Sequence, residues 1–114
     1  MNDLQEWIEE LQQQDKLIIV EGKKDVLALQ ELGITHVRAL NAQPIFSFAD
    51  SLAEKEIVIL TDLDPAGRKL YRQLKKSLVN CGNKVDTAFR EFLFRETSLR
   101  EIEGLPKYLN TTHK

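Results

Sequence analysis

Two stretches decide the fold: LIIVEGKKD at residues 17–25 and IVILTDLDPAGRKL at residues 57–70. Each begins with four apolar residues, 17–20 and 57–60, a run typical of a strand that is buried on both faces of a parallel sheet. Each run passes through acidic residues and a glycine toward a predicted helix. Pro65 suits the first turn of such a helix, because its missing N–H would be unpaired there anyway. The two stretches therefore predict two strand–turn–helix units.

The other elements follow from periodicity and from helix start and stop signals. Four apolar residues at helical spacing, Leu4, Trp7, Ile8 and Leu11, predict an N-terminal helix over 3–14. The sequence further predicts helices at 23–32, 45–54 and 65–80, strands at 36–40 and 85–88, and a helix at 89–94. Ser98 and Glu101 form a capping-box pattern for a last short helix that stops near residues 104–106.

Alternation of short buried strands with helices predicts an α/β fold with a four-stranded parallel sheet core and helices on both faces. The length of 114 residues is that of one domain. We expect a single domain over 1–114, with its core at about 17–88 and a C-terminal helical extension at 89–110.

Composition limits the classes of protein. No run of about 18 apolar residues is present, so no membrane span is expected. The acidic N-terminus lacks the pattern of a signal peptide. Cys81 is the only cysteine, which excludes an intrachain disulfide and a cysteine-based zinc site. These features predict a cytoplasmic protein with no membrane partner.

Charge is distributed unevenly although the net charge is only −2. Residues 1–64 hold 5 Lys/Arg against 13 Asp/Glu, whereas residues 65–114 hold 11 against 5. One interpretation is an anionic partner that binds the basic half. The other is that the two halves attract each other within the fold.

Three carboxylates follow the two decisive strands. Glu21 ends the first, and Asp62 and Asp64 follow the second. Because ligands bind beyond the carboxyl ends of parallel strands, neighbouring strands would bring these acids to one edge. Clustered carboxylates repel unless a cation or proton lies between them. Hard oxygen ligands favour Mg²⁺ or Mn²⁺.

The string IIVEGKKDVLALQELGI, followed about 40 residues later by VILTDLDPAGRKL, resembles the Toprim domain family. The similarity covers roughly residues 17–88 and is strongest to small stand-alone and 5S ribosomal RNA maturation ribonuclease-like members. It implies that Asp62 and Asp64 hold Mg²⁺ or Mn²⁺. It implies that Glu21 acts as a general acid/base and can also be a ligand. The partner implied is a nucleic acid, with structured RNA preferred over DNA.

The resemblance predicts Mg-dependent phosphodiester cleavage or transfer. The chain lacks the tyrosine-bearing domain of topoisomerases and the extra domains of primases, and Tyr71 and Tyr108 match no family nucleophile. A non-catalytic nucleic-acid-binding module of a larger complex stays open, as does a protein partner or homo-oligomer. Haloacid-dehalogenase and receiver folds are disfavoured because they place their acidic pair after the first strand.

Several candidate residues have a plain structural alternative. Asp64 precedes Pro65 and can cap a helix, whether or not it also binds metal. Asp25 lies in a first helical turn, where the helix dipole favours an acid in any case. The alternative is that Asp25 supports the metal ligands from behind without binding the metal itself. The candidate residues for contact with phosphate or nucleic acid are Gly22, Lys23, Lys24, Gly67, Arg68 and Asn41. Tight turns or solvated charge explain the presence of these residues equally well.

Overall fold

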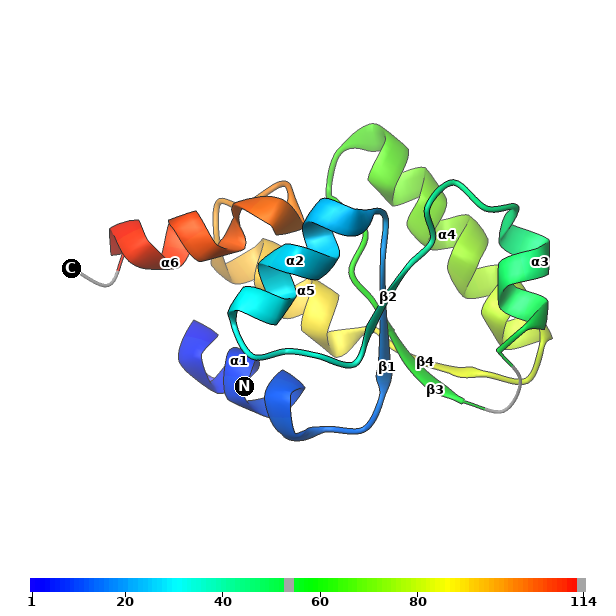
Figure 1. Ribbon diagram of the computed structural model, residues 1–114, viewed down its shortest axis with the longest axis horizontal. Coiled ribbons are helices and arrows are strands. Elements are labelled where there is room, and N and C mark those ends of the chain that lie inside the picture. Colours follow the sequence, from blue (N-terminus) through cyan, green and yellow to red (C-terminus); the bar gives the residue numbers. More distant parts are fainter. Residues whose placement is uncertain (53–54, 113–114) are drawn as a thin grey trace.

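The computed structural model describes residues 1–52 and 55–112, and Figure 1 shows the arrangement of their helices and strands. In chain order the elements are α1 (Leu4–Gln13), β1 (Leu17–Val20), α2 (Lys23–Glu31), β2 (Val37–Ala39), α3 (Ile45–Asp50), β3 (Glu56–Ile59), α4 (Pro65–Asn80), β4 (Lys84–Asp86), α5 (Ala88–Glu96), the 3₁₀ turn η1 (Ile102–Gly104) and α6 (Leu105–Thr112).

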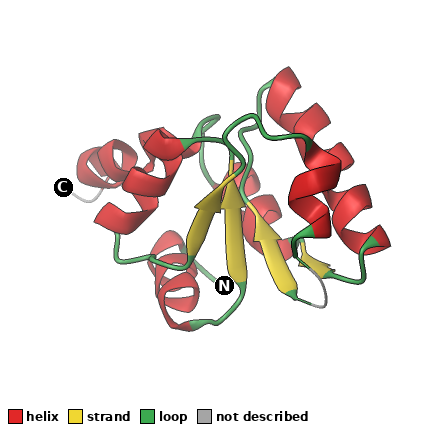
Figure 2. Ribbon diagram, turned by 45° about the vertical axis from the view of Figure 1, so that its right-hand side comes forward, coloured by secondary structure: helices red, strands yellow, loops and turns green. Residues whose placement is uncertain are grey.

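The sheet has four parallel strands in the order β2-β1-β3-β4. Ile18 of β1 lies opposite Val37 of β2 on one side and Val58 of β3 on the other. Figure 2 shows the strand arrows running in a common direction. The α/β prediction with a four-stranded parallel core is confirmed. Since β1 and β3 are neighbours, the chain segments that follow them leave the sheet side by side.

Helices cover both faces of the sheet, as predicted. Alternate residues of a strand point to opposite faces, and β1 shows this directly. Ile18 and Val20 pack in a core cluster with residues of α1, α2 and α5, whereas Leu17 and Ile19 pack in a second cluster with residues of α3 and α4. Figure 1 shows α3 and α4 together on one side and α1, α2, α5 and α6 on the other.

The N-terminal helix is tied to the C-terminal part of the chain. Trp7 is fully buried, and its Nε1–H donates a hydrogen bond of 2.8 Å to the carbonyl oxygen of Phe89. The two rings also meet edge to face, with centroids 6.4 Å apart. Lys16 forms an ion pair of 2.7 Å with Asp86, which links the residue before β1 to the end of β4. The two contacts of Trp7 hold α1 against α5 on one face of the sheet.

Helix α4 has the bounds that the sequence predicts. Asp64 caps its start, with a carboxylate oxygen 2.7 Å from the Gly67 N–H, and Pro65 occupies the first turn. Leu74 and Leu78 are fully buried on its inner side. Within residues 1–52 and 55–112, no helix combines the length and apolar character needed to cross a membrane.

Some predicted boundaries differ by a few residues. Helix α3 ends at Asp50 rather than at residue 54, and residues 53 and 54 lie outside the described part of the chain. Strand β4 is Lys84–Asp86 instead of 85–88. The reason is local, because the carboxylate of Asp86 accepts a hydrogen bond from the Ala88 N–H at 2.9 Å and turns the chain into α5.

The prediction for residues 98–106 is wrong. No capping box forms at Ser98, and α6 begins at Leu105 where the helix was expected to stop. The Arg100 carbonyl accepts from the Leu63 N–H at 2.8 Å, and the Ile102 N–H donates to the Asp62 carboxylate at 2.9 Å. These contacts with the loop after β3 hold the segment away from helical geometry. Proline then fits the first turn of α6.

Candidate functional site

The ends of β1 and β3 bring Glu21 and Asp62 together. Glu21 follows Val20 directly, and Asp62 follows β3 after two residues. The pairing of the two strands continues past β3, because the Leu60 N–H donates to the Ile19 carbonyl at 2.8 Å. Beyond it, the Asp62 N–H donates a hydrogen bond of 2.7 Å to Oε2 of Glu21. The sequence predicts that Glu21, Asp62 and Asp64 meet at one sheet edge, and the structure brings Glu21 and Asp62 into contact there.

Asp62 is held by three parts of the chain. Its N–H binds Glu21, its Oδ1 accepts from the Ile102 N–H at 2.9 Å, and its carbonyl accepts from Nη2 of Arg90 at 2.8 Å. Arg90 also donates through Nε to the Thr61 carbonyl at 3.1 Å. The backbone of Asp62 and one of its carboxylate oxygens are thus held in place by these three contacts.

The loop from Asp62 to Gly67 is folded tightly on itself. Gly67 is buried, and a Cβ added there would lie 2.2 Å from the Asp62 carbonyl oxygen. The Thr61 hydroxyl donates to the Gly67 carbonyl at 2.9 Å, and Asp64 accepts from the Gly67 N–H. Only glycine fits this approach of the helix start to the backbone of Asp62. The capping role predicted for Asp64 is confirmed, while its metal role stays a prediction.

Asp25 lies beneath the site rather than on its surface. The side chain is buried, and its Oδ2 accepts a hydrogen bond of 3.2 Å from the Gly22 N–H at the start of α2. Burial, followed by repulsion from Asp62, raises the pKa of Asp25 to about 6. Asp25 therefore shapes the turn behind Glu21 and adds to the negative potential around it.

The electrostatics of the site are those of crowded carboxylates. Burial is the main cause that raises the pKa of Glu21, and Asp62 and Asp64 add repulsion. Burial also raises the pKa of Asp62, where Asp64 and Glu103 repel. The positive charge of Arg90 acts in the opposite direction and offsets part of the rise in the pKa of Glu21 and of Asp62. The fold concentrates negative charge here and offsets only part of it.

The donor set fits an open divalent-cation site rather than a closed cage. Among the described residues, no three His, Cys, Asp or Glu side chains converge as a ready metal cluster. Mg²⁺ commonly takes only one or two carboxylates and keeps several waters. Glu21 and Asp62 each use one oxygen in a backbone hydrogen bond, which leaves Oε1 and Oδ2 for a cation or its waters. Crowded, partly desolvated carboxylates are the groups that a cation would relieve.

The predicted basic and polar contacts are less fixed than the acids. The side chains of Lys23, Lys24, Arg68 and Asn41 are all exposed, and Gly22 is partly exposed. No ion pair ties any of the three cations to an acid within the described residues. Asn41 has a left-handed backbone, with φ of 53°, and its N–H donates to the Glu21 carbonyl at 3.0 Å. The loop after β2 therefore lies next to Glu21, as its place on the sheet edge predicts.

Sequence reasoning missed Arg90. Its guanidinium carbon lies 4.4 Å from the ring centroid of Tyr71 and 5.3 Å from that of Phe94, while the same group binds the carbonyls of Thr61 and Asp62. The signal in the sequence was a single arginine inside the largely apolar stretch AFREFLF at residues 88–94. A cation at such a place commonly has a specific buried partner.

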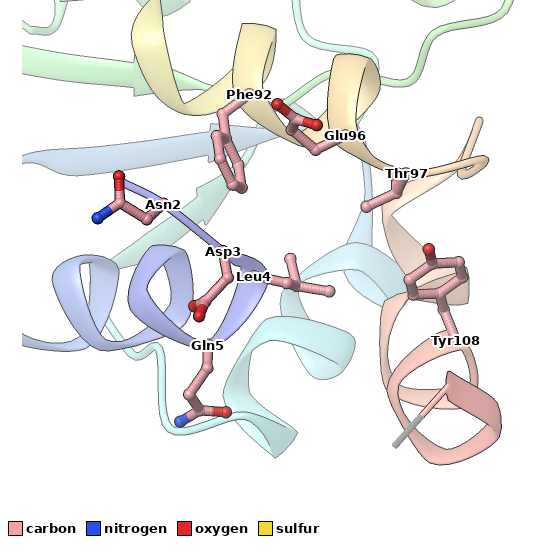
Figure 3. Close-up of a pocket in the computed structure, with 8 residues that line it drawn as sticks. All are labelled: Asn2, Asp3, Leu4, Gln5, Phe92, Glu96, Thr97 and Tyr108. Atoms are coloured by element: carbon pink, nitrogen blue, oxygen red, sulfur yellow. The ribbon is translucent and has the colours of Figure 1, made fainter. Parts of the chain in front are cut away.

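One hollow of the surface is separate from these acids. Figure 3 shows it between the start of α1, the end of α5 and α6, with Phe92 and Tyr108 among its walls. Its lining residues are Asn2, Asp3, Leu4, Gln5, Phe92, Glu96, Thr97 and Tyr108. It contains none of the candidate site residues, whereas a second hollow includes Lys23 and Asn41 in its lining.

Comparison with known proteins gives a consistent result. The family model described as "Toprim domain" matches residues 15–89, which span the sheet and the acidic loops. The chain is 39% identical to a UPF0292 protein of Methanocaldococcus jannaschii, over 94% of this chain and 90% of that one. It is 35% identical to a UPF0292 protein of Pyrococcus abyssi, over 90% of this chain and 79% of that one.

A solved structure shares the architecture. It is that of a protein from Aquifex aeolicus, which is 34% identical and superimposes with a TM-score of 0.82. The similarity covers 90% of this chain and 98% of the other. The fold described above is therefore found in a second chain of nearly the same extent.

Proposed function

Because the chain belongs to the Toprim domain family, we propose that it performs Mg²⁺- or Mn²⁺-dependent phosphodiester cleavage or transfer on a structured nucleic acid, with RNA preferred over DNA. Membership in the family suggests a metal-dependent function related to nucleic acids. The preference for RNA rests on the resemblance of the EGKKD and LTDLDPAGR segments to those of the ribonuclease-like members of the family. We further propose the cytoplasm as its compartment.

One observation carries the proposal. The Asp62 N–H donates to Oε2 of Glu21 at 2.7 Å, which ties the acid of one strand to the acidic loop of its neighbour. Oε1 of Glu21 is then the oxygen that can exchange a proton. Since burial and nearby acids raise the pKa of Glu21, its protonated form is more accessible than that of an ordinary glutamate. This is the property that a general acid/base requires.

The aspartates have a different proposed part. Asp62 and Asp64 would hold the cation, with Glu21 as an additional ligand in the alternative arrangement. A bound Mg²⁺ or Mn²⁺ supplies stabilisation of the negative charge that develops on the phosphate. The carboxylate of Asp62 is oriented by the Ile102 N–H, and its backbone is fixed by Arg90. A preorganised ligand of this kind costs little reorganisation when charge develops.

A non-catalytic binding module of a larger complex is the second candidate. The observation in its favour is that, among the described residues, no three His, Cys, Asp or Glu side chains converge as a ready metal cluster. In this case the same acids would grip a cation and a phosphate without turnover.

Single-turnover cleavage separates the two candidates. Cellular RNA and DNA that the purified protein retains are sequenced, and the best-retained species are incubated with saturating Mn²⁺ or Mg²⁺. Glu21→Gln keeps the shape of the side chain but cannot exchange a proton. We expect this variant to bind as well as wild type and to cleave about 10²- to 10⁴-fold more slowly.

The controls define the outcome. Asp64→Asn should reduce metal binding and rate together, whereas Asp50→Asn, at an exposed position of α3, should change neither. Cleavage by Glu21→Gln at the wild-type rate would remove the proposed role of Glu21. Retention of nucleic acid by wild type without any cleavage would replace the enzyme with the binding module.

A further inference from the structure

Helix α4 carries positive charge that the fold does not balance. Its sixteen residues include five cations and no Asp or Glu. These are Arg68, Lys69, Arg72, Lys75 and Lys76, and all five are exposed. The ion pairs found among the described residues involve other cations, namely the N-terminus, Lys16 and Arg95. Direct pairing with the acidic half therefore does not explain the basic helix.

The cations form a row that begins at the acidic loop. Arg68, Arg72 and Lys76 are four residues apart, so they share one side of the helix and rise by about 6 Å at each step. Arg68 lies one turn from Asp64, the cap of the helix. A polyanion bound along this row would have one end beside Asp62 and Glu21. The row is therefore continuous with the candidate site.

A shallow hollow lies on the same helix. It is lined by Tyr71, Arg72, Lys75, Lys76, Val79 and Asn80. Val79 is half exposed, at 51%, and gives the hollow an apolar wall. The Tyr71 ring is backed by Arg90, whose guanidinium lies 4.4 Å from the ring centroid and is itself bound to two carbonyls. The ring is thus held in place before any ligand arrives.

Cations interleaved with an aromatic and an apolar side chain suit a single strand rather than a duplex. A single strand offers both phosphates and unstacked bases, whereas a duplex hides the faces of its bases. The phosphates would contact Arg68, Arg72 and Lys76, and a base would pack against Tyr71 and Val79.

We propose that α4 is the binding surface for a single-stranded segment of the nucleic acid, which it leads from the Tyr71–Val79 hollow to the acidic loop at Asp62. This inference rests on the proposed function and adds the surface and the strandedness of the substrate. It also assigns the positive charge of the basic half of the sequence to nucleic-acid binding. The alternative is that these side chains form only a solvated helix face.

The test measures binding without metal, so that it does not depend on the acids. Fluorescence anisotropy in EDTA follows a labelled single-stranded RNA and a blunt duplex of the same length over a range of salt concentrations. The variant Arg72→Gln/Lys76→Gln neutralises two cations of the row. The matched control Lys84→Gln/Lys107→Gln removes two exposed cations outside α4.

We expect Arg72→Gln/Lys76→Gln to weaken single-strand binding roughly tenfold or more at low salt. The log–log salt slope should become shallower by roughly 0.7 for each phosphate that the variant no longer neutralises. The control should match wild type. Circular dichroism melting curves check that the variants fold, and because both substituted side chains are exposed they should melt as wild type does.

The failures are distinguishable. Equal binding by Arg72→Gln/Lys76→Gln and wild type would overturn the α4 surface and leave the proposed function standing. So would an equal weakening in the control, or tighter binding of the duplex than of the single strand. Absence of binding to any nucleic acid, with or without Mn²⁺, would overturn both the surface and the proposed function.

Discussion

Gly67 gives the sharpest test of how the acidic loop is built. A methyl group added at Gly67 would lie 2.2 Å from the Asp62 carbonyl oxygen, 2.7 Å from its carbonyl carbon and 3.0 Å from its Cα. Ordinary contact between carbon atoms is roughly 3.5–4.0 Å. All three close atoms are backbone, so no side-chain rotation relieves the overlap. Gly67→Ala therefore has to move the backbone of Asp62 or the start of α4.

The cost follows from what such a movement breaks. Asp62 makes hydrogen bonds through its N–H, its carbonyl and its carboxylate. Overpacking costs about 1–3 kcal/mol, and sometimes more. For a domain of about this size each kcal/mol lowers the Tm by roughly 4–8 °C. We expect Gly67→Ala to lower the Tm by about 5–20 °C and to bind Mn²⁺ more weakly than wild type.

Gly22 is the matched control. It follows the other decisive strand and likewise lies at the start of a helix, as the N-cap of α2. A Cβ there meets nothing within 4 Å, and its φ of −149° is extended backbone. Gly22→Ala should stay within about 1 kcal/mol of wild type, because a small decrease in N-cap preference is offset by reduced freedom of the unfolded chain. Thermal unfolding followed by the fluorescence of Trp7, the single tryptophan, measures both variants. Equal stability of Gly67→Ala and Gly22→Ala would refute the reasoning.

Three other predictions concern the surroundings of the site. Burial raises the folded-state pKa of Asp25 to about 6, so its protonated form stabilises the fold at low pH. This contribution is lost as pH rises from about 4 through 6. Asp25→Asn should flatten that part of the stability–pH curve in EDTA, and an unchanged curve would contradict the prediction. Trp7→Phe leaves the Phe89 carbonyl without its donor and should cost about 1–3 kcal/mol or more in denaturant unfolding followed by circular dichroism. Arg90→Met removes the two charged donors that hold the Thr61 and Asp62 carbonyls and should destabilise by roughly 1.5–3 kcal/mol in denaturant unfolding; Arg90→Lys, which can still donate to a carbonyl, should recover part of this stability, and an equal loss in both variants would contradict the role of the donor.

The fold was largely predictable because its strands are buried on both faces. Residues 17–20 and 57–60 have no polar residue, as is typical of a central parallel strand. Strand β1 was predicted to the residue, and β3 begins and ends one residue earlier than predicted. Helix α4 was also predicted to the residue, since Asp64-Pro65 marks its start and Gly82 follows its end. Short edge strands such as β4 were shifted, because a single hydrogen bond, which the Asp86 carboxylate accepts from the Ala88 N–H, decides where the strand gives way to α5.

The candidate site was predictable only in part. The contact of Glu21 with the Asp62 backbone follows from the rule that parallel strands end at one edge. The contributions of Ile102 and Arg90 could not be found this way. They come from a segment 40 residues and a helix 28 residues along the chain from Asp62, and no local pattern encodes such tertiary contacts. The same contacts explain why residues 98–101 are not helical.

Two glycines that look alike in the sequence differ in the structure. Gly22 caps the start of α2 and Gly67 lies in the first turn of α4, each shortly after an acidic strand end. Only Gly67 is required by a close approach, and this depends on the path of the loop rather than on the residue type. Sequence patterns therefore indicate the candidate site, while packing decides which of its residues tolerate a substitution.

The central claim is that Asp62 and Asp64, with Glu21 beside them as a candidate third ligand, form a divalent-cation site at the shared edge of β1 and β3. Mn²⁺ binding, measured by water-proton relaxation and by calorimetry, tests it most directly on wild type, Asp62→Asn and the control Asp50→Asn. We predict that Asp62→Asn weakens Mn²⁺ binding by about tenfold or more, while Asp50→Asn binds as wild type does. Equal Mn²⁺ affinity in wild type and Asp62→Asn would contradict the claim.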